Sequence, residues 1–400
     1  MNYAGNASYE LKKLSLFHKP KGIEQELEID LSSAFVTLSM YESIFVGTIS
    51  GSVAIIDSYN LQDILPLYGN ERIELEFNTS GSSNIILYSG IIYKISNKNR
   101  ISEHTSGYIL HFISDVAIKS QRLEVNQAYR DTCSNVTKRI FESFGVDKKL
   151  EVESTKGIEH FVFGSLSPLE AISLLAKRSY SVSDNCGYYF YEDIEKYNFV
   201  SLEYLYQQEP SAQYHYRTKG VYDDVSQRFV EAFSNIQDIT VMEENSYLDR
   251  LMEGQHGLSS IRFDLFNKQI SKLEYNKERF FDRTKSLGDL AYKKEVETSN
   301  DDLTIMSYSN DNQFDQQRNV ISRMRRVEIE TFRAKVIIMG DSSLRVGNTC
   351  LCYIPNWNTS QHNLKSMIGE KFLITEIHHM LTQTTYQQTM MIQKESYDIV

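Results

Sequence analysis

Acidic side chains spaced two residues apart are the first candidates for chemistry in this sequence. Glu74 and Glu76 lie on one face of a predicted strand, and Asp57 ends another apolar run. A glycosidase needs two carboxyl groups about 5–9.5 Å apart across a groove. Carboxylates are equally expected on the polar face of any amphipathic strand. Because nothing marks one pair over another, no catalytic residue is predicted.

Histidine and cysteine supply the candidate metal ligands. His378 and His379 form the only histidine pair, and neighbouring side chains of a strand point to opposite faces, so the two rings cannot chelate one ion. One ring is expected to face inward and the other solvent. Cys350 and Cys352 share a face but provide only half of a metal site. The four cysteines are therefore expected to be small buried hydrophobic residues, and no metal or cofactor is predicted.

A basic cluster of Arg323, Arg325 and Arg326, with Arg318 nearby, lies in a predicted helix. It could bind phosphate, but the commoner use of such a cluster is a solvated or subunit-contacting helix face. The sequence contains no G-x-x-x-x-G-K-[ST], G-x-S-x-G, H-E-x-x-H or C-x-x-C motif. The sequence therefore offers no coherent catalytic set.

Length and charge limit the class of protein further. A chain of 400 residues is expected to form two or three domains. It has 53 acidic and 42 basic residues and a net charge of -11, which argues against binding nucleic acid or an anionic membrane by bulk charge. No apolar run reaches the roughly 18 residues of a membrane span, and the first 20 residues lack the apolar core of a secretory signal. A soluble protein is expected.

Apolar and polar residues alternate in the first part of the chain. The alternation is clear in residues 34–40, 71–77 and 91–95, and glycine-rich breakers separate these runs. Short strands with regular turns predict an antiparallel barrel or sandwich over residues 28–118. Residues 1–27, which carry four lysines, are expected to form an N-terminal arm.

A small α/β domain is predicted at residues 119–200. Apolar residues from Tyr129 to Phe144 recur at steps of three and four, which is typical of a helix that ends at Gly145. A second helix is expected to begin at Ser167, with Pro168 at its first position and Glu170 closing a capping box.

The rest of the chain returns to β-structure. Residues 201–279 and 332–400 are predicted to form a second barrel, which a polar, partly helical insertion at 280–331 interrupts. The predicted fold is mainly β with α+β parts: two antiparallel β-barrels, a small α/β domain and a helical insertion.

The turn within the second barrel has the most distinctive pattern, G-D-x-x-L-R-x-G. Its residues are Gly340, Asp341, Leu344, Arg345 and Gly347. The Gly-Asp pair favours a turn, the leucine can fold back over the mouth of the barrel, and the last glycine gives the backbone freedom before the next strand. We single out these five residues as a structural turn.

This turn, the following Lys-Phe-Leu-Ile-Thr-Glu-Ile-His-His run at 371–379 and a tyrosine-containing last strand resemble the baseplate central hub protein of contractile-tailed bacteriophages. The run Gly-Ser-Val-Ala-Ile-Ile-Asp at 51–57 and Gly-Asn-Glu-Arg-Ile-Glu-Leu at 69–75 resemble the first barrel of that family in order and spacing. The domain order is also similar, so the resemblance covers nearly the whole chain. The hub parts of secretion-system spike proteins are related.

The resemblance implies a structural role. In that family both barrels are tail-tube-like, and three chains form a pseudo-sixfold ring that joins the tail tube to the central spike. The implied partners are two further copies of the chain, the spike protein, tail-tube or tube-initiator proteins and other baseplate proteins. DNA would pass through the channel without specific binding, which the acidic net charge suits. The implied location is the virion baseplate, assembled in the host cytoplasm.

Two alternative functions stay open at this stage. A carbohydrate- or receptor-binding tail module usually presents exposed tryptophans, and this chain has only Trp357. A β-rich polysaccharide hydrolase would need a carboxylate pair in a deep cleft, for which the sequence offers no preferred candidates.

Overall fold

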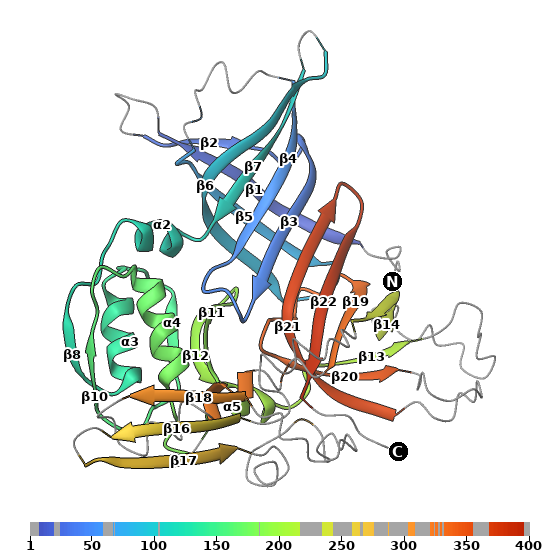
Figure 1. The fold of residues 1–400 in the computed structure, drawn as a ribbon. Coiled ribbons are helices and arrows are strands. Elements are labelled where there is room, and N and C mark those ends of the chain that lie inside the picture. The colour runs from blue at the N-terminus through green and yellow to red at the C-terminus, as the bar shows by residue number, and fades with distance from the viewer. Residues whose placement is uncertain are drawn as a thin grey trace.

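A computed structural model describes most of the chain. The described residues are 8–19, 25–58, 67, 69–102, 105–183, 185–216, 234–242, 258–264, 267–275, 287, 303–308, 321–323, 325–326, 329, 332–354 and 368–395. Trp357 and most of the predicted insertion at 280–331 lie outside these residues. Within the described part, the prediction of a mainly β protein with a smaller α/β part is confirmed (Figure 1).

Seven strands form the first barrel. They are β1 (Tyr9–His18), β2 (Leu27–Asp30), β3 (Phe35–Ser43), β4 (Ser50–Asp57), β5 (Arg72–Thr79), β6 (Ile85–Arg100) and β7 (Ser106–Ile113). Their pairing order is β3-β4-β7-β6-β5-β1-β2, with every pair antiparallel. The short strand β2 pairs with β1 alone and lies at the end of this order. Alternating side chains of β5 fill its core, as the period-two pattern predicts. In the predicted runs 34–40 and 91–95 the alternation is wrong at Val36 and Tyr93, which are exposed, because a β-bulge shifts the register beside each of them.

The middle of the predicted N-terminal arm is a strand of the first barrel and not an arm. Tyr9–His18 form β1, which pairs with β5 along most of its length, and Leu14 and Leu16 are fully buried in the first barrel. The lysines of this segment suggested an exposed arm, but they alternate with apolar residues that point into the core.

A second set of strands repeats this arrangement. It consists of β13 (Ala212–Tyr216), β14 (Asn235–Ile236), β15 (Asp238–Val241), β19 (Phe332–Met339), β20 (Thr349–Ile354), β21 (Ile368–Thr382) and β22 (Tyr386–Lys394). The order β15-β19-β22-β21-β20-β13-β14 matches that of the first barrel strand for strand. The one difference is the direction of β13, which runs parallel to its neighbours.

The two barrels share one 14-stranded sheet. The long strand β21 pairs with β20 through Ile368–Leu373 and then with β3 of the first barrel through Glu376–Thr382. Figure 1 shows β3 and β21 side by side at the join. Backbone hydrogen bonds therefore run without a break from one barrel into the other.

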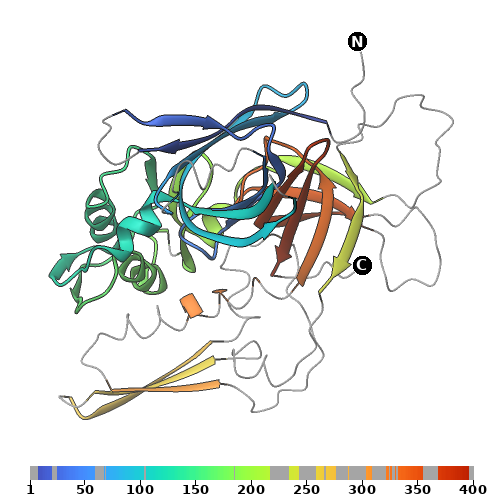
Figure 2. The same ribbon diagram turned by 90° about the horizontal axis from the view of Figure 1, so that it is seen from above.

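The α/β part lies beside the barrels (Figures 1 and 2). Its elements are α2 (Asp115–Gln121), β8 (Ala128–Asp131), α3 (Cys133–Glu142), β9 (Lys149–Val152), β10 (Glu159–Val162), α4 (Pro168–Arg178), β11 (Tyr188–Glu192), β12 (Lys196–Ser201) and α5 (Leu202–Tyr206). The predicted capping box at Ser167 and Glu170 is confirmed. The predicted first helix begins later than Tyr129, which lies in β8.

A separate three-stranded sheet comes from the region between β15 and β19. Its strands are β16 (Leu258–Asp264), β17 (Gln269–Tyr275) and β18 (Leu303–Tyr308), in the order β17-β16-β18. Two of them fall within the segment predicted for the second barrel, and β18 falls in the predicted polar insertion. The described part of 201–279 thus contributes strands to two different sheets. In the part of the chain that the structure describes, no helix is long and apolar enough to cross a membrane.

The position of β1 predicts the effect of shortening the chain. Deleting residues 1–19 removes a strand of the first barrel and exposes the apolar residues that it covers, so we expect insoluble protein or loss of the cooperative thermal transition. Deleting residues 1–7 leaves every described strand in place and serves as the control. Unchanged melting of the 1–19 deletion would contradict the role of β1.

Candidate functional site: the turn between the two barrels

The turn singled out in the sequence begins at Gly340, directly after β19. The Gly340 N–H donates to the carbonyl oxygen of Tyr386 at 3.0 Å. A Cβ atom at this position would lie 2.0 Å from the ring of Tyr386, well inside van der Waals contact. Only glycine fits here because the backbone runs directly against a buried aromatic ring.

The turn is bonded to the first barrel through Thr79 at the end of β5. The Thr79 hydroxyl donates to the Gly340 carbonyl oxygen at 2.9 Å and accepts from the Ser342 N–H at 2.8 Å. The Ser342 hydroxyl donates to the Asn84 carbonyl oxygen at 2.7 Å. Thr79 and Ser342 are both buried. These bonds satisfy polar groups that would otherwise be buried without partners.

Asp341 holds the shape of the turn itself. Its carboxylate accepts from the Ser343 N–H at 2.8 Å and from the Ser343 hydroxyl at 2.6 Å. The backbone of Asp341 also exchanges two hydrogen bonds with the side-chain amide of Gln388, at 2.8 and 3.0 Å. The carboxylate therefore acts as a local cap of the kind that aspartate commonly makes in turns.

The second half of the turn reaches the α/β part. Arg345 donates from one guanidinium nitrogen to the carbonyl oxygens of Ser342 and Leu344, at 2.8 and 2.7 Å, and from another to the Glu195 carboxylate at 3.2 Å. At Gly347 the backbone has φ of +81°, and a Cβ atom would lie 2.2 Å from the Tyr191 hydroxyl oxygen. Glycine is required there for both reasons.

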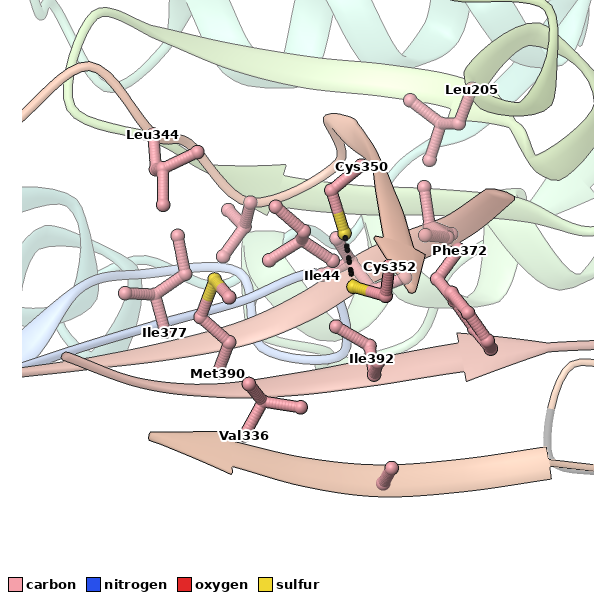
Figure 3. Packing of buried hydrophobic residues seen from close by; sticks show 14 of the residues in the cluster. Ile44, Leu205, Val336, Leu344, Cys350, Cys352, Phe372, Ile377, Met390 and Ile392 are labelled. Carbon is pink, nitrogen blue, oxygen red and sulfur yellow. Dashed lines mark hydrogen bonds between the residues drawn. The ribbon is translucent and has the colours of Figure 1, made fainter. Parts of the chain in front are cut away.

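Leu344 is fully buried in the core of the second barrel, which Figure 3 shows from close by. It lies with Ile377 and Met390 in the same cluster. The leucine thus packs into the core of the second barrel. The five residues singled out in the sequence are brought together in one turn, which contacts both barrels and the α/β part.

A buried polar cluster lies beside this turn. His379 contacts the Glu42 carboxylate at 2.7 Å and the Tyr386 hydroxyl at 2.8 Å, and Gln388 donates to Tyr386 at 2.9 Å. Glu42 comes from β3 and the others from β21 and β22, so the cluster crosses the join between the barrels. Sequence reasoning placed one histidine inward, but it did not find Glu42 as its partner because the two lie 337 residues apart.

His378 points to the other face, as predicted, and stacks on Tyr41 with 4.2 Å between ring centres. Burial lowers its pKa below the ordinary value. The ring is half-buried against an aromatic neighbour, so the expectation of a solvated ring holds only in part.

The arginines of the predicted basic cluster lie in different environments. Arg325 is buried, with its guanidinium 2.8 Å from Glu203 and 3.5 Å from Glu395. Burial raises the pKa of Glu203, and the nearby guanidinium opposes that shift. Neither a solvated helix face nor a phosphate site describes Arg325. Arg323 is exposed, and Arg318 lies outside the described residues.

The other candidate groups are engaged within the fold. Glu74 accepts from Lys13 at 2.7 Å, and the buried carboxylate of Asp57 accepts from the Tyr108 hydroxyl at 3.4 Å. The sulfur atoms of Cys350 and Cys352 lie 3.7 Å apart in the second core. The prediction that the four cysteines are buried is confirmed, and none of them forms a disulfide. Among the described residues, no group of three or more His, Cys, Asp or Glu could hold a metal ion.

The tight fit at Gly340 predicts a specific loss of stability. Gly340→Ala forces a methyl group into the ring of Tyr386, so we expect it to reduce the free energy of unfolding by about 1–3 kcal/mol or more. Gly164→Ala is the control, because a Cβ there meets nothing within 4 Å. Equal denaturant midpoints for the two variants would show that the turn does not constrain the fold.

The buried ion pair predicts that Arg325 contributes much more to stability than the exposed Arg323. Arg325→Met leaves the carboxylates of Glu203 and Glu395 buried without their cation, which typically costs about 3–5 kcal/mol. Arg323→Met, at an exposed position, is expected to change stability by about 0.5 kcal/mol or less. Thermal and urea unfolding measure both, and a small effect at Arg325 would contradict the assignment.

Comparison with solved structures identifies the fold. The chain is similar to the 43 kDa tail protein of prophage MuSo2 from Shewanella oneidensis, with a TM-score of 0.59 and 8% identity over 96% of this chain and 98% of that one. It is similar to a tail protein from Neisseria meningitidis, with a TM-score of 0.58 and 11% identity over 97% of each chain.

A third similar structure is a chain of the Francisella PdpA–VgrG complex, with a TM-score of 0.51 and 11% identity over 98% of this chain and 60% of that one. No protein-family model matches the sequence, and no curated protein is similar to it at a significant level. The resemblance noted in the sequence is confirmed for the fold: this chain has the fold of phage tail proteins.

Proposed function

We propose that this chain is a structural baseplate hub protein of a phage contractile tail. In this proposal three copies form a ring with pseudo-sixfold symmetry, which joins the tail tube to the central spike and encloses the channel for DNA. The observation that carries the proposal is the repeated barrel: one chain holds two barrels with the same strand order, joined through β3 and β21. Two equivalent units per chain allow three chains to provide six.

The register supports the equivalence of the two barrels. Ile92 and Phe112 pair with each other as Ile374 and Ile392 do, and in both barrels a β-bulge follows directly. Phe112 pairs in turn with Gly51, and Ile392 with Ala334. A bulge is a specific structural feature and is not expected to recur at the same place by chance.

The partners follow from the same proposal. The similar folds belong to tail proteins and to a complex that contains VgrG. On this basis the ring contacts the central spike protein on one side and tail-tube or tube-initiator proteins on the other, within the virion baseplate, and it assembles in the host cytoplasm. The five residues of the turn have a structural role, since they fix the two barrels to each other.

The proposed ring lets DNA pass through its channel without specific binding. The net charge of -11 for the chain would attract the DNA phosphates only weakly.

The mass and shape of the purified protein test this proposal. Light scattering is expected to give about three times the chain mass of 46.3 kDa, and negative-stain images are expected to show a ring with a central hole. If assembly needs the spike, the trimer should appear when the two proteins are expressed together. A monomer in both conditions, or a compact particle without a hole, would contradict the ring.

A further inference from the structure

Strand β10 of the α/β part has one paired edge and one open edge. It pairs antiparallel with β8, and among the described strands it has no second partner. The Phe163 N–H donates to the Gln127 carbonyl oxygen at 3.1 Å. In an antiparallel ladder every second residue then points its N–H and C=O away from the partner strand. His160 and Val162 therefore direct their backbone groups toward the open edge.

The side chains along β10 alternate between the core and water. Phe161 and Phe163 are buried in the core of the α/β part. Ile158 and Val162 are 68% and 83% exposed, and Val162 has the largest exposed fraction of the large hydrophobic residues that the structure describes. His160 lies between them and is exposed. Proteins commonly protect an open edge with charged residues, proline or a covering loop, and this edge carries apolar side chains instead.

Turns limit the length of the open edge. Gly157, directly before Ile158, has φ of +87°, and Ser165 has φ of +52°. Both values lie in the left-handed region, where an extended ladder cannot continue. Residues 158–163 therefore remain for pairing, which suits a partner strand of about six residues.

The open edge lies in a basic part of an acidic chain. Arg130 of β8 is paired with His160, so its side chain lies on the exposed face of β10. The guanidinium of Arg178, at the end of α4, lies over the ring of Phe161 and 6.0 Å from its centre. Both arginines are exposed, whereas the whole chain has a net charge of -11. The carboxylate in this stretch belongs to Glu159, which alternates to the inner face and is half-buried.

The position of the edge leaves it accessible to another protein. Figure 1 shows β8 and β10 at the left of the view, on the side of the α/β part that faces away from the barrels. A strand added there would not meet the barrel surfaces that the proposed ring uses.

We propose that an extended, acidic segment of a neighbouring baseplate protein adds antiparallel to β10, as a third strand of the β8–β10 sheet. Its backbone pairs with the open groups of His160 and Val162, its apolar side chains cover Ile158 and Val162, and its carboxylates lie near Arg130. In this mode of binding the main-chain hydrogen bonds supply affinity and alternate side chains supply specificity. The proposal rests on the proposed baseplate role for the identity of the partner, but the contact itself does not depend on the ring.

A synthetic peptide tests the contact. The probe is fluorescein-labelled Asp-Glu-Val-Thr-Val-Thr-Val-Asp-Glu, and fluorescence anisotropy follows its binding to the full chain. We expect saturable binding that weakens as the salt concentration rises. In the antiparallel arrangement, the residues opposite His160 and Val162 share their face and direct their own N–H groups to β10. Methylating the valine nitrogens should therefore abolish binding, and methylating the threonine nitrogens should leave it intact.

Variants of the chain separate backbone pairing from charge. Val162→Pro removes an N–H that faces the open edge but makes no bond to β8, so we expect unchanged melting and an affinity about tenfold lower or less. Val162→Thr keeps the N–H and the branched shape and is the matched control. Arg130→Glu should weaken binding of the acidic peptide and favour the basic counterpart Lys-Arg-Val-Thr-Val-Thr-Val-Arg-Lys. Leu87→Lys, at an exposed position of the first barrel, should change neither.

The outcomes separate this proposal from the proposed function. No saturable binding of the acidic peptide, equal affinities for Val162→Pro and Val162→Thr, or loss of binding on threonine methylation alone would overturn the β10 contact. A changed light-scattering mass for Val162→Pro would show that β10 pairs with a second copy, and it would overturn the proposal too. Trimers that do not bind the peptide leave the ring standing, whereas a monomer that binds it supports the β10 contact and contradicts the ring.

Discussion

The unpaired edge of a β-strand is the constraint on which this structure depends. Every backbone N–H and C=O that leaves water needs a partner, and β21 meets this need with three strands: β22 on one edge, and β20 then β3 on the other. The exchange of β20 for β3 halfway along β21 turns two barrels into one sheet. The turn at Gly340–Gly347 stabilises this arrangement, because it bonds to Thr79 of the first barrel, buries Leu344 in the second and contacts Glu195 of the α/β part.

Much of the fold could be predicted from local patterns. The alternation in β5 and the capping signals at Ser167 depend on neighbouring residues, so the sequence reveals them directly. The position of β1 could not be found in this way, since lysines on its outer face hid the apolar residues beneath. Residues 258–275 read as strands of the second barrel, because a pattern of alternation indicates a strand but not the sheet to which it belongs.

The turn was recognisable because a Gly-Asp pair and a later glycine are local turn signals, although the close approach of Tyr386 to Gly340 has no local signal. Its long-range contacts were not predictable. Glu42 with His379, and Arg325 with Glu203, are pairs of residues that are distant in sequence, and no local pattern marks one as the partner of the other. The first pair lies at the join between the barrels, and the second lies at the contact with the α/β part.

The central claim is that the two barrels are equivalent units which unfold as one body because they share a sheet. Native-state hydrogen exchange measures this most directly, by following peptides that cover β3 and the Glu376–Thr382 half of β21 as denaturant is added. The account predicts that both segments lose protection in the same step, together with the Leu14–Leu16 region of the first core. Exchange of β3 at much lower denaturant than β21, with the second barrel still protected, would contradict it.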